Sequence, residues 1–350
     1  MDDSQPPRSR HLTGSVARVF AVGLAVGLFG WTLRNLDADA AIRLLGSLGP
    51  LAALVLLPQA IGALCHAGAW RAVLAPLGGG ASTAALFRLY VSAEAARMVA
   101  PAGPAVAESL AAVTLVRRHE TPWGAAVGSL ALKKAWVVGT HGVWMVGLLT
   151  FASDELSSLR GWVPPGVEPW WVAGSMTIAL LVTSLVTLLL LSSRRVATQV
   201  TGLLTRSPIR TVRAWAEERR QRGAGALRIP LRSHLTTATL LSAQWATEVL
   251  ETWLVLRLLG APASLPLALL LELGGAMVRS LAFMVPGGLG FQDASHVAML
   301  SAVGVPGGTE IGAAFVVLKR LKDVVYVALG LTLLALAGRR HDTMTIPVST

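Results

Sequence analysis

The sequence predicts an all-α polytopic membrane protein with about six full spans and two re-entrant helical hairpins in an inverted-repeat arrangement. First, the 350-residue chain is 53% hydrophobic and only 14% charged, and its mean hydropathy of +0.61 is too high for a soluble domain. Second, most basic residues lie in loops between apolar runs, which is how membrane orientation is encoded. Third, a break rich in proline and glycine interrupts the apolar sequence in each half of the chain.

Charge and cysteine content exclude several other classes. The formal net charge of +11 would suit a nucleic-acid-binding protein, but the position of the basic residues favours membrane orientation. We therefore expect no nucleic-acid partner. The single cysteine, Cys65, excludes an internal disulfide and a cysteine-rich metal site. No nucleotide-binding motif occurs, and we expect no cofactor, no bound metal and no enzymatic activity.

The chain begins with a polar segment, residues 1–18, which predicts a cytoplasmic tail before a first span at 19–33. Because Ala38-Asp39-Ala40 resembles a cleavage site, a signal peptide is the alternative. A second span is expected at about 50–70. These segments open the first half of the protein, residues 19–192.

A re-entrant hairpin is predicted at 83–117 from the length of its arms. An apolar helix carrying Glu94 and Arg97 runs to a break at 100–105, and a return arm carrying Glu108 ends at residue 117. That arm spans roughly 20 Å at about 1.5 Å per residue, short of the ~30 Å hydrocarbon core. Because broken backbone at membrane depth needs protein or a watery cavity around it, we expect a hairpin that enters from the cytoplasm.

The rest of the first half contains two long apolar segments. A helix is expected at 123–151 with Lys133 and Lys134 near its middle, followed by an acidic outer loop at 152–168. Trp170 and Trp171 are typical of an interfacial belt and open the next span. The following loop, 193–234, is rich in arginine and is predicted to be cytoplasmic, with contact to anionic lipid headgroups left open.

The second half, residues 235–337, begins with a span at 235–259 that carries two glutamates. A second re-entrant hairpin is predicted at 264–304, with Glu272 and Arg279 before a break at 286–290. A final span at 310–337 leads to a tail at 338–350. If the helix before Pro286 crossed alone, the basic pair 339–340 would lie outside, so the hairpin is preferred. We expect both termini in the cytoplasm and the protein in the cytoplasmic (inner) membrane.

The two breaks align as copies of one pattern. Each has an acid seven residues after its proline, and each is followed by a long helix with a basic residue 33 or 34 positions after that proline. Broken helices at matching positions of two inverted halves indicate a transporter site near the midplane. The alternative is that the glycines only permit close packing and the prolines only kink. The matched pairs are Pro101 with Pro286, Gly103 with Gly288, Glu108 with Asp293, and Lys134 with Arg320.

Ionisable residues within membrane segments are candidates for function. The candidate substrate-binding residues lie at or near the two breaks: Arg97, Pro101, Gly103, Glu108, Lys133, Lys134, Arg279, Pro286, Gly287, Gly288, Gly290, Asp293, Lys319 and Arg320. The candidate coupling or gating residues are Glu94, Glu272 and Asp323.

These candidates predict a basic cavity that takes an anion. Arginine forks and lysine charges suit phosphate, and freed amides at a broken helix end add donors. We hypothesise that Glu94 and Arg279 pair across the pseudo-twofold axis as a gate, and that Glu94, Glu108 and Asp293 are candidates for proton coupling. The alternative is a purely structural network, in which the basic residues pair with the membrane acids, among them Glu94, Glu108, Glu248, Glu251, Glu272 and Asp323.

The segment VPGGLGFQD with the later LKRLKD, and the weaker first copy APAGPAVAE with LKK, resemble the transmembrane-domain family of lysylphosphatidylglycerol synthases, which is flippase-like. The resemblance covers roughly residues 12–337. It places Asp293 at the family's acidic position and Arg320 with Asp323 at its Arg-x-x-Asp helix. The first half departs from the pattern, because Arg97 falls at or near a usual asparagine and no acid accompanies Lys133-Lys134.

The resemblance implies a lipid-translocating membrane domain without the family's soluble synthase domain. We therefore expect a transporter or flippase that moves an anionic or polyprenyl-linked lipid between leaflets and acts through a membrane lipid partner, with a homo-oligomer left open. One alternative is an intramembrane glycosyl- or phosphotransferase that uses Asp37 and Asp39 as acids. Another is a non-transporting scaffold subunit for envelope assembly.

Overall fold

The computed structural model describes residues 46–100, 102–193 and 229–342, together with Arg43 and isolated positions between 198 and 217. Several predicted features lie outside these residues: the tail at 1–18, the span at 19–33, Pro101, most of the basic loop and the last eight residues. Every regular element in the described ranges is helical. The expected all-α fold is confirmed for that part of the chain.

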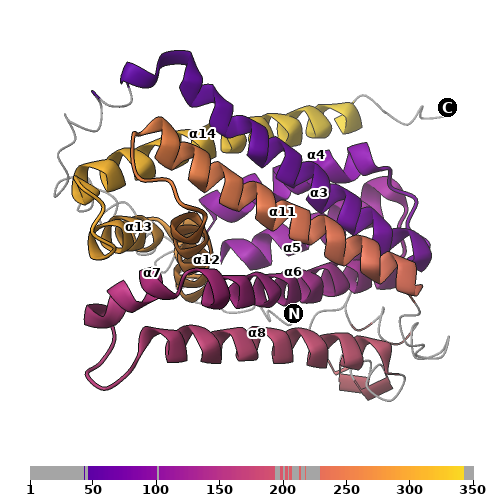
Figure 1. The fold of residues 1–350 in the computed structure, drawn as a ribbon. Coiled ribbons are helices and arrows are strands. Elements are labelled where there is room, and N and C mark those ends of the chain that lie inside the picture. The colour runs from indigo at the N-terminus through magenta and orange to yellow at the C-terminus, as the bar shows by residue number, and fades with distance from the viewer. Residues whose placement is uncertain are drawn as a thin grey trace, which may run out of the picture.

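Figure 1 shows the helices of the first half in indigo to rose. A 3-10 turn η1 (Gly49–Val55) leads into α3 (Leu56–Leu74) and η2 (Ala75–Leu77). The first broken pair is α4 (Thr83–Val99) and α5 (Gly103–His119). It is followed by α6 (Trp123–Phe151), the short α7 (Ser153–Ser157) and η3 (Ser158–Trp162), and α8 (Pro169–Ser192).

The second half repeats that order of a long helix, a broken pair and a long helix. It contains α11 (Leu231–Leu258), then α12 (Leu265–Leu281), η4 (Pro286–Gly288) and α13 (Phe291–Ala302), and last α14 (Gly308–Asp342). Both broken pairs start at a serine N-cap: Ser82 Oγ accepts from Ala85 N at 3.2 Å, and Ser264 Oγ accepts from Leu267 N at 3.1 Å. A serine N-cap satisfies one of the free amides at a helix start, which fixes where each pair begins.

Small residues allow the long helices to cross closely. A Cβ placed on Gly62 of α3 would lie 2.9 Å from Thr247 Oγ1 of α11. The Thr247 side chain of α11 therefore packs directly against the α3 backbone at Gly62. A Cβ on Gly330 of α14 would lie 2.5 Å from the Ala95 Cβ of α4. Such contacts are typical of helix packing in membranes, where association depends on close van der Waals fit.

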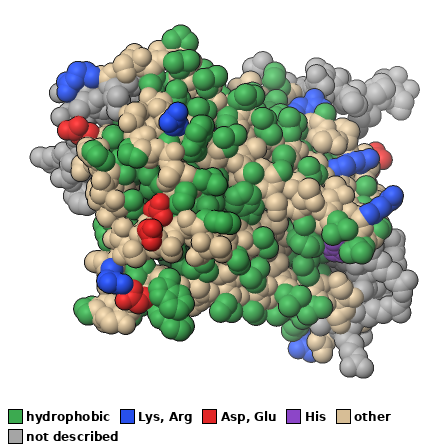
Figure 2. All heavy atoms as spheres, viewed as in Figure 1, with side chains coloured by type: hydrophobic (Ala, Val, Ile, Leu, Met, Phe, Trp, Pro, Cys, Tyr) green, Lys and Arg blue, Asp and Glu red, His purple; other side chains and the backbone are tan. Residues whose placement is uncertain are grey.

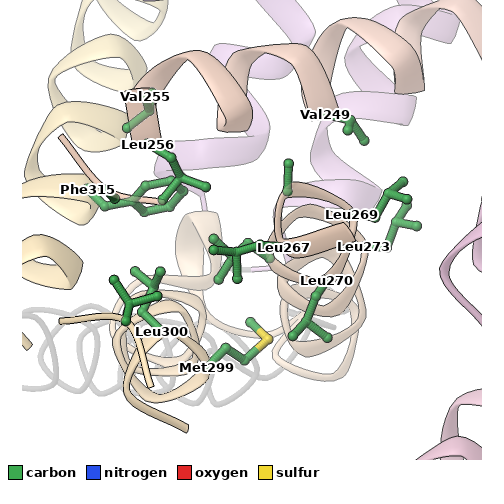
Figure 3. Packing of buried hydrophobic residues seen from close by; sticks show 14 of the residues in the cluster. Val249, Val255, Leu256, Leu267, Leu269, Leu270, Leu273, Met299, Leu300 and Phe315 are labelled. Carbon is green, nitrogen blue, oxygen red and sulfur yellow. The ribbon is translucent and has the colours of Figure 1, made fainter. Parts of the chain in front are cut away.

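The buried apolar side chains form two clusters, each centred on one broken pair. One cluster joins α3, α4, α5 and the start of α6 around Trp70 and Leu115. The other joins α11, α12, α13 and the start of α14, and Figure 3 shows Leu267 of α12 pointing toward Leu300 and Phe315, with Leu269 and Leu273 on the opposite side of α12. Each broken pair is therefore packed against long helices, and these come from both halves, since α4 also contacts α14 and α12 also contacts α6.

Two of the described helical segments are long and apolar enough to cross a membrane, Gly46–Leu77 and Pro169–Ser192. A third is added if Trp123–Phe151 and Ser153–Trp162, which are bent by 87° relative to each other, form one span. The expected six full spans, and the re-entrant character of the two broken pairs, stay predictions. In Figure 2, hydrophobic side chains dominate the middle of the visible face, while Lys, Arg, Asp and Glu gather toward its two ends.

Candidate functional site

A cavity of about 70 Å³ lies between the two broken pairs and is lined by α3, α4, α11, α12, η4, α13 and α14. That volume holds several water molecules or one small polar group. The breaks themselves meet here, because a Cβ on Gly287 of η4 would lie 3.5 Å from the Met98 carbonyl oxygen near the end of α4. Its charged lining residues are Glu94, Arg97, Glu248, Glu251, Glu272, Arg279, Asp293, Lys319, Arg320, Lys322 and Asp323.

The cavity is charge-balanced, which corrects the expectation of a basic one. Five cations stand against six carboxylates, so the fully ionised lining has a formal charge of −1. The expectation counted embedded lysines and arginines without the glutamates that tertiary packing brings beside them. Much of the predicted alternative, a network of ion pairs, is therefore present in the structure.

Asp293 connects the glycine-rich turn to α14. The turn needs glycine, because Gly287, Gly288 and Gly290 have φ values of 59°, 63° and 78°, a region that side-chain-bearing residues rarely adopt. Asp293 Oδ2 accepts from Gly290 N at 2.9 Å, and its Oδ1 accepts from Arg320 Nε at 2.9 Å. The acid of the sequence motif thus caps α13 and neutralises the arginine of α14.

Arg320 is held between two carboxylates. Its Nη2 lies 2.7 Å from Asp293 Oδ1, and its Nη1 donates to Asp323 Oδ2 at 3.0 Å. The Asp323 partner lies three residues along α14, a spacing that puts both side chains on one face of the helix. The Arg-x-x-Asp pattern is therefore an ion pair within α14 that also reaches α13.

A second network joins α14 to α11 and α12. Lys319 Nζ donates to Glu272 Oε2 at 2.5 Å and lies 3.5 Å from Glu251 Oε1. Lys322 Nζ donates to the same Glu251 oxygen at 2.7 Å, and Thr252 Oγ1 donates to Glu272 Oε2 at 2.6 Å. Glu251 is only 1% exposed. The two lysine ammoniums therefore stabilise the charge of a buried carboxylate that water does not reach.

Arg279 differs from the other cations of the cavity. The predicted pair between Glu94 and Arg279 is not formed, because Glu94 Oε1 instead accepts from Arg97 Nε at 2.8 Å on the same helix. Within the described ranges, Arg279 has neither an ion pair nor a hydrogen bond from its side chain. It lies beside the glycine-rich turn, where a Cβ on Gly288 would be 3.1 Å from Arg279 Cγ.

Residues of the first break lie largely outside the cavity wall. Glu108 and Lys134 form an ion pair of 3.2 Å, but their side chains are 34% and 53% exposed. Gly103 lies under the carbonyl of Arg97, and a Cβ there would be 1.9 Å from that oxygen. Gly103 thus permits the close return of the chain. Pro286, Gly288 and Gly290 belong to the turn of the second break and likewise shape the backbone.

Lys133 also lies outside the cavity, behind Tyr90. Its side chain is buried, and its Nζ lies 4.2 Å from the centroid of the Trp70 ring and 5.7 Å from that of Tyr90. An ammonium over aromatic faces is stabilised by the ring quadrupole. Lys133 therefore packs the first half of the protein, and its expected contact with substrate stays a prediction.

Sequence reasoning missed four polar residues without a formal charge that line the cavity, Gln59, Tyr90, Gln292 and His296. His296 follows Asp293 by three residues, a spacing that puts both on one face of α13, and this signal was available. Its Nε2 lies 3.2 Å from the Leu271 carbonyl oxygen. Among the described residues, no group of three or more His, Cys, Asp or Glu side chains is placed to hold a metal ion.

The fold and the cavity define a helical integral membrane protein with an ion-pair network buried between two broken helices. The chain matches the family described as the lysylphosphatidylglycerol synthase TM region over residues 18–330, and it belongs to that family. The resemblance drawn from the sequence is confirmed. No curated protein and no solved structure matches the chain.

Proposed function

We propose that this protein moves a lipid with an anionic headgroup, or a polyprenyl-linked lipid phosphate, between the leaflets of the cytoplasmic membrane. The observation that carries the proposal is Arg279, a cation that lines the cavity without an ion-pair partner in the described part of the chain. A guanidinium that is free to bind presents a fork of donors that matches a phosphate. Membership of a membrane-domain family linked to lipid chemistry supports the same assignment.

The internal repeat supports a transport mechanism. The acid and the base that match between the halves form an ion pair in each, Asp293 with Arg320 and Glu108 with Lys134. Each broken pair also packs against the long helix that follows the broken pair of the other half, α4 against α14 and α12 against α6. We propose that the halves are inverted repeats with re-entrant breaks, which would let them rock about the cavity.

The size of the cavity limits what could enter. A volume of about 70 Å³ accommodates a phosphate-sized group but no acyl chain, since a cavity needs roughly 10–15 Å³ for each water molecule alone. In this proposal the headgroup alone enters the cavity and the hydrocarbon tails stay in the bilayer. The protein then acts as a transporter and not as an enzyme, with both termini cytoplasmic. Asp37 and Asp39, the acids of the transferase alternative, lie outside the described residues.

Reconstitution into vesicles tests the proposal. Vesicles would carry a headgroup-accessible probe on phosphatidylglycerol, on a polyprenyl phosphate or on phosphatidylcholine, and the rate at which each probe reaches the other leaflet would be measured. We expect faster movement of the two anionic lipids only. Arg279→Gln should slow it on the order of tenfold or more, since a hydrogen bond to a charged group contributes about 1.5–3 kcal/mol.

Arg257→Gln is the matched control, because Arg257 is exposed near the end of α11, where it lies over the Trp253 ring. Equal rates for anionic lipid and phosphatidylcholine would contradict the proposal. So would equal rates for the Arg279→Gln and Arg257→Gln proteins.

A further inference from the structure

Glu248 is the carboxylate of the cavity that the ion-pair networks leave out. It lies on α11, one turn before Glu251, and lines the same cavity. Its Oε2 atom is buried and accepts no hydrogen bond from a described residue. Glu251 also has one such oxygen, but its other oxygen binds both Lys319 and Lys322. Glu248 therefore lacks the neighbouring lysine ammoniums that balance the negative charge of Glu251.

Every other carboxylate of the cavity has a cation assigned to it. Glu94 pairs with Arg97, Asp293 and Asp323 share Arg320, and Glu251 and Glu272 share the two lysines. This leaves one acid and one base of the lining, Glu248 and Arg279, without an ion pair in the described part of the chain. The titratable and charged groups around Glu248, taken over the elements that line the cavity or pack against α11, are His66, Tyr90, Glu94, Arg97, His141, Glu251, Glu272, Arg279, Asp293, His296, Lys319, Arg320, Lys322 and Asp323.

The unpaired acid and base affect each other through any ligand that enters. A buried carboxylate without a partner is costly while it is ionised, and taking up a proton removes that cost. An anion bound at Arg279 would bring further negative charge into a small, poorly solvated space beside Glu248. Binding of the anion and protonation of Glu248 therefore favour one another, and thermodynamic linkage makes that preference reciprocal.

We propose that Glu248 is a proton-binding site of the cavity and that it takes up one proton from water when an anion binds at Arg279. The coupling part rests on the anion site of the proposed function, whereas the proton site stands on the position of Glu248 itself. Glu94, Glu108 and Asp293, the coupling candidates from sequence, are engaged with Arg97, Lys134 and Arg320. We therefore place the coupling site on α11.

Infrared difference spectroscopy on the full chain in detergent tests the proton site without any ligand. Between about pH 8 and about pH 6, a range in which exposed carboxylates stay ionised, a protonated carboxylic acid band should appear in the wild-type protein. Glu248→Gln should abolish that band, and Glu248→Asp should retain a displaced one. Glu310→Gln is the control, because Glu310 is exposed at the start of α14 and does not line the cavity. A band that survives unchanged in Glu248→Gln overturns the proton site.

Proton uptake on binding tests the coupling. Short-chain phosphatidylglycerol, whose phosphodiester does not titrate near neutral pH, would be added to each protein in weakly buffered solution, with binding measured by calorimetry and protons by a pH indicator. We expect uptake of about one proton per bound phosphatidylglycerol in the wild type and almost none in Glu248→Gln, which still binds. Binding by the wild type without proton uptake overturns the coupling. No binding by the wild type overturns the anion site and the coupling with it, while the infrared band still decides the proton site.

Discussion

The two matched ion pairs should differ sharply in what they contribute to stability. Asp293→Asn keeps an amide oxygen that can still accept from Gly290 N, so the substitution mainly removes charge. Asp293 and Arg320 have side chains that are 3% and 14% exposed, and removal of one partner from a buried pair costs about 3–5 kcal/mol. Because Arg320 keeps Asp323, we expect a loss near the lower limit, about 3 kcal/mol.

Glu108→Gln at the matching position should cost far less. Its pair with Lys134 is substantially exposed, and solvent screening reduces such pairs to about 0.2–1 kcal/mol. Both variants would be unfolded with increasing denaturing detergent in mild-detergent micelles, with tryptophan fluorescence as the signal. Equal losses for the two variants, or a smaller loss for Asp293→Asn, would refute the argument that burial separates the two copies of the motif.

Four further substitutions separate structural from functional roles, each measured by the same unfolding assay. Glu251→Gln removes a negative charge that the Lys319 and Lys322 ammoniums share. It should lower the free energy of unfolding by about 3–5 kcal/mol. Gly103→Ala places a methyl group against the Arg97 carbonyl and should lower the free energy of unfolding by about 1–3 kcal/mol or more. Gly147→Ala is the control, because its methyl group would lie in open space on α6, and it should raise the free energy of unfolding by up to about 1 kcal/mol. Lys133→Met removes a buried charge together with about 2 kcal/mol of cation–π attraction; it should leave lipid movement unchanged in the vesicle assay, and a transport defect would return Lys133 to the binding site.

Local patterns predicted the glycine-rich turn well. The spacing from Pro286 to Asp293 and on to Arg320 reappears as one connected set of contacts, since the acid caps the helix that the turn begins. In the structure both broken pairs begin at a serine N-cap, Ser82 and Ser264. These features depend on residues close in the chain or on one helix face, which is where sequence patterns are informative.

The partners of charged side chains were predicted less well, even within one helix. Arg97 was assigned to substrate without its partner Glu94, three residues earlier on α4, although that spacing was visible in the sequence. Lys133 and Lys134 are adjacent and were given one role, but successive helical residues point about 100° apart. One lysine therefore packs on Trp70, while the other reaches Glu108.

The acids of α11 were the main omission from the predicted site. Glu248 and Glu251 were visible as charges in an apolar segment, but their face of α11 is set by contacts with α3, α12 and α14. No local pattern reports those contacts. The predicted cavity consequently had too few carboxylates.

Four charged residues on α14 lie within five consecutive positions, 319–323, and they serve two separate networks. Lys319 and Lys322 reach toward α11 and α12, while Arg320 and Asp323 reach toward α13 and the glycine-rich turn. Since a helix advances about 100° per residue, these two pairs form adjacent stripes on one rigid cylinder. A small axial rotation of α14 would weaken both sets of ion pairs at once. The contacts of α14 with α11 and α12 on one side of the cavity, and with α13 on the other, therefore depend on the orientation of this one helix.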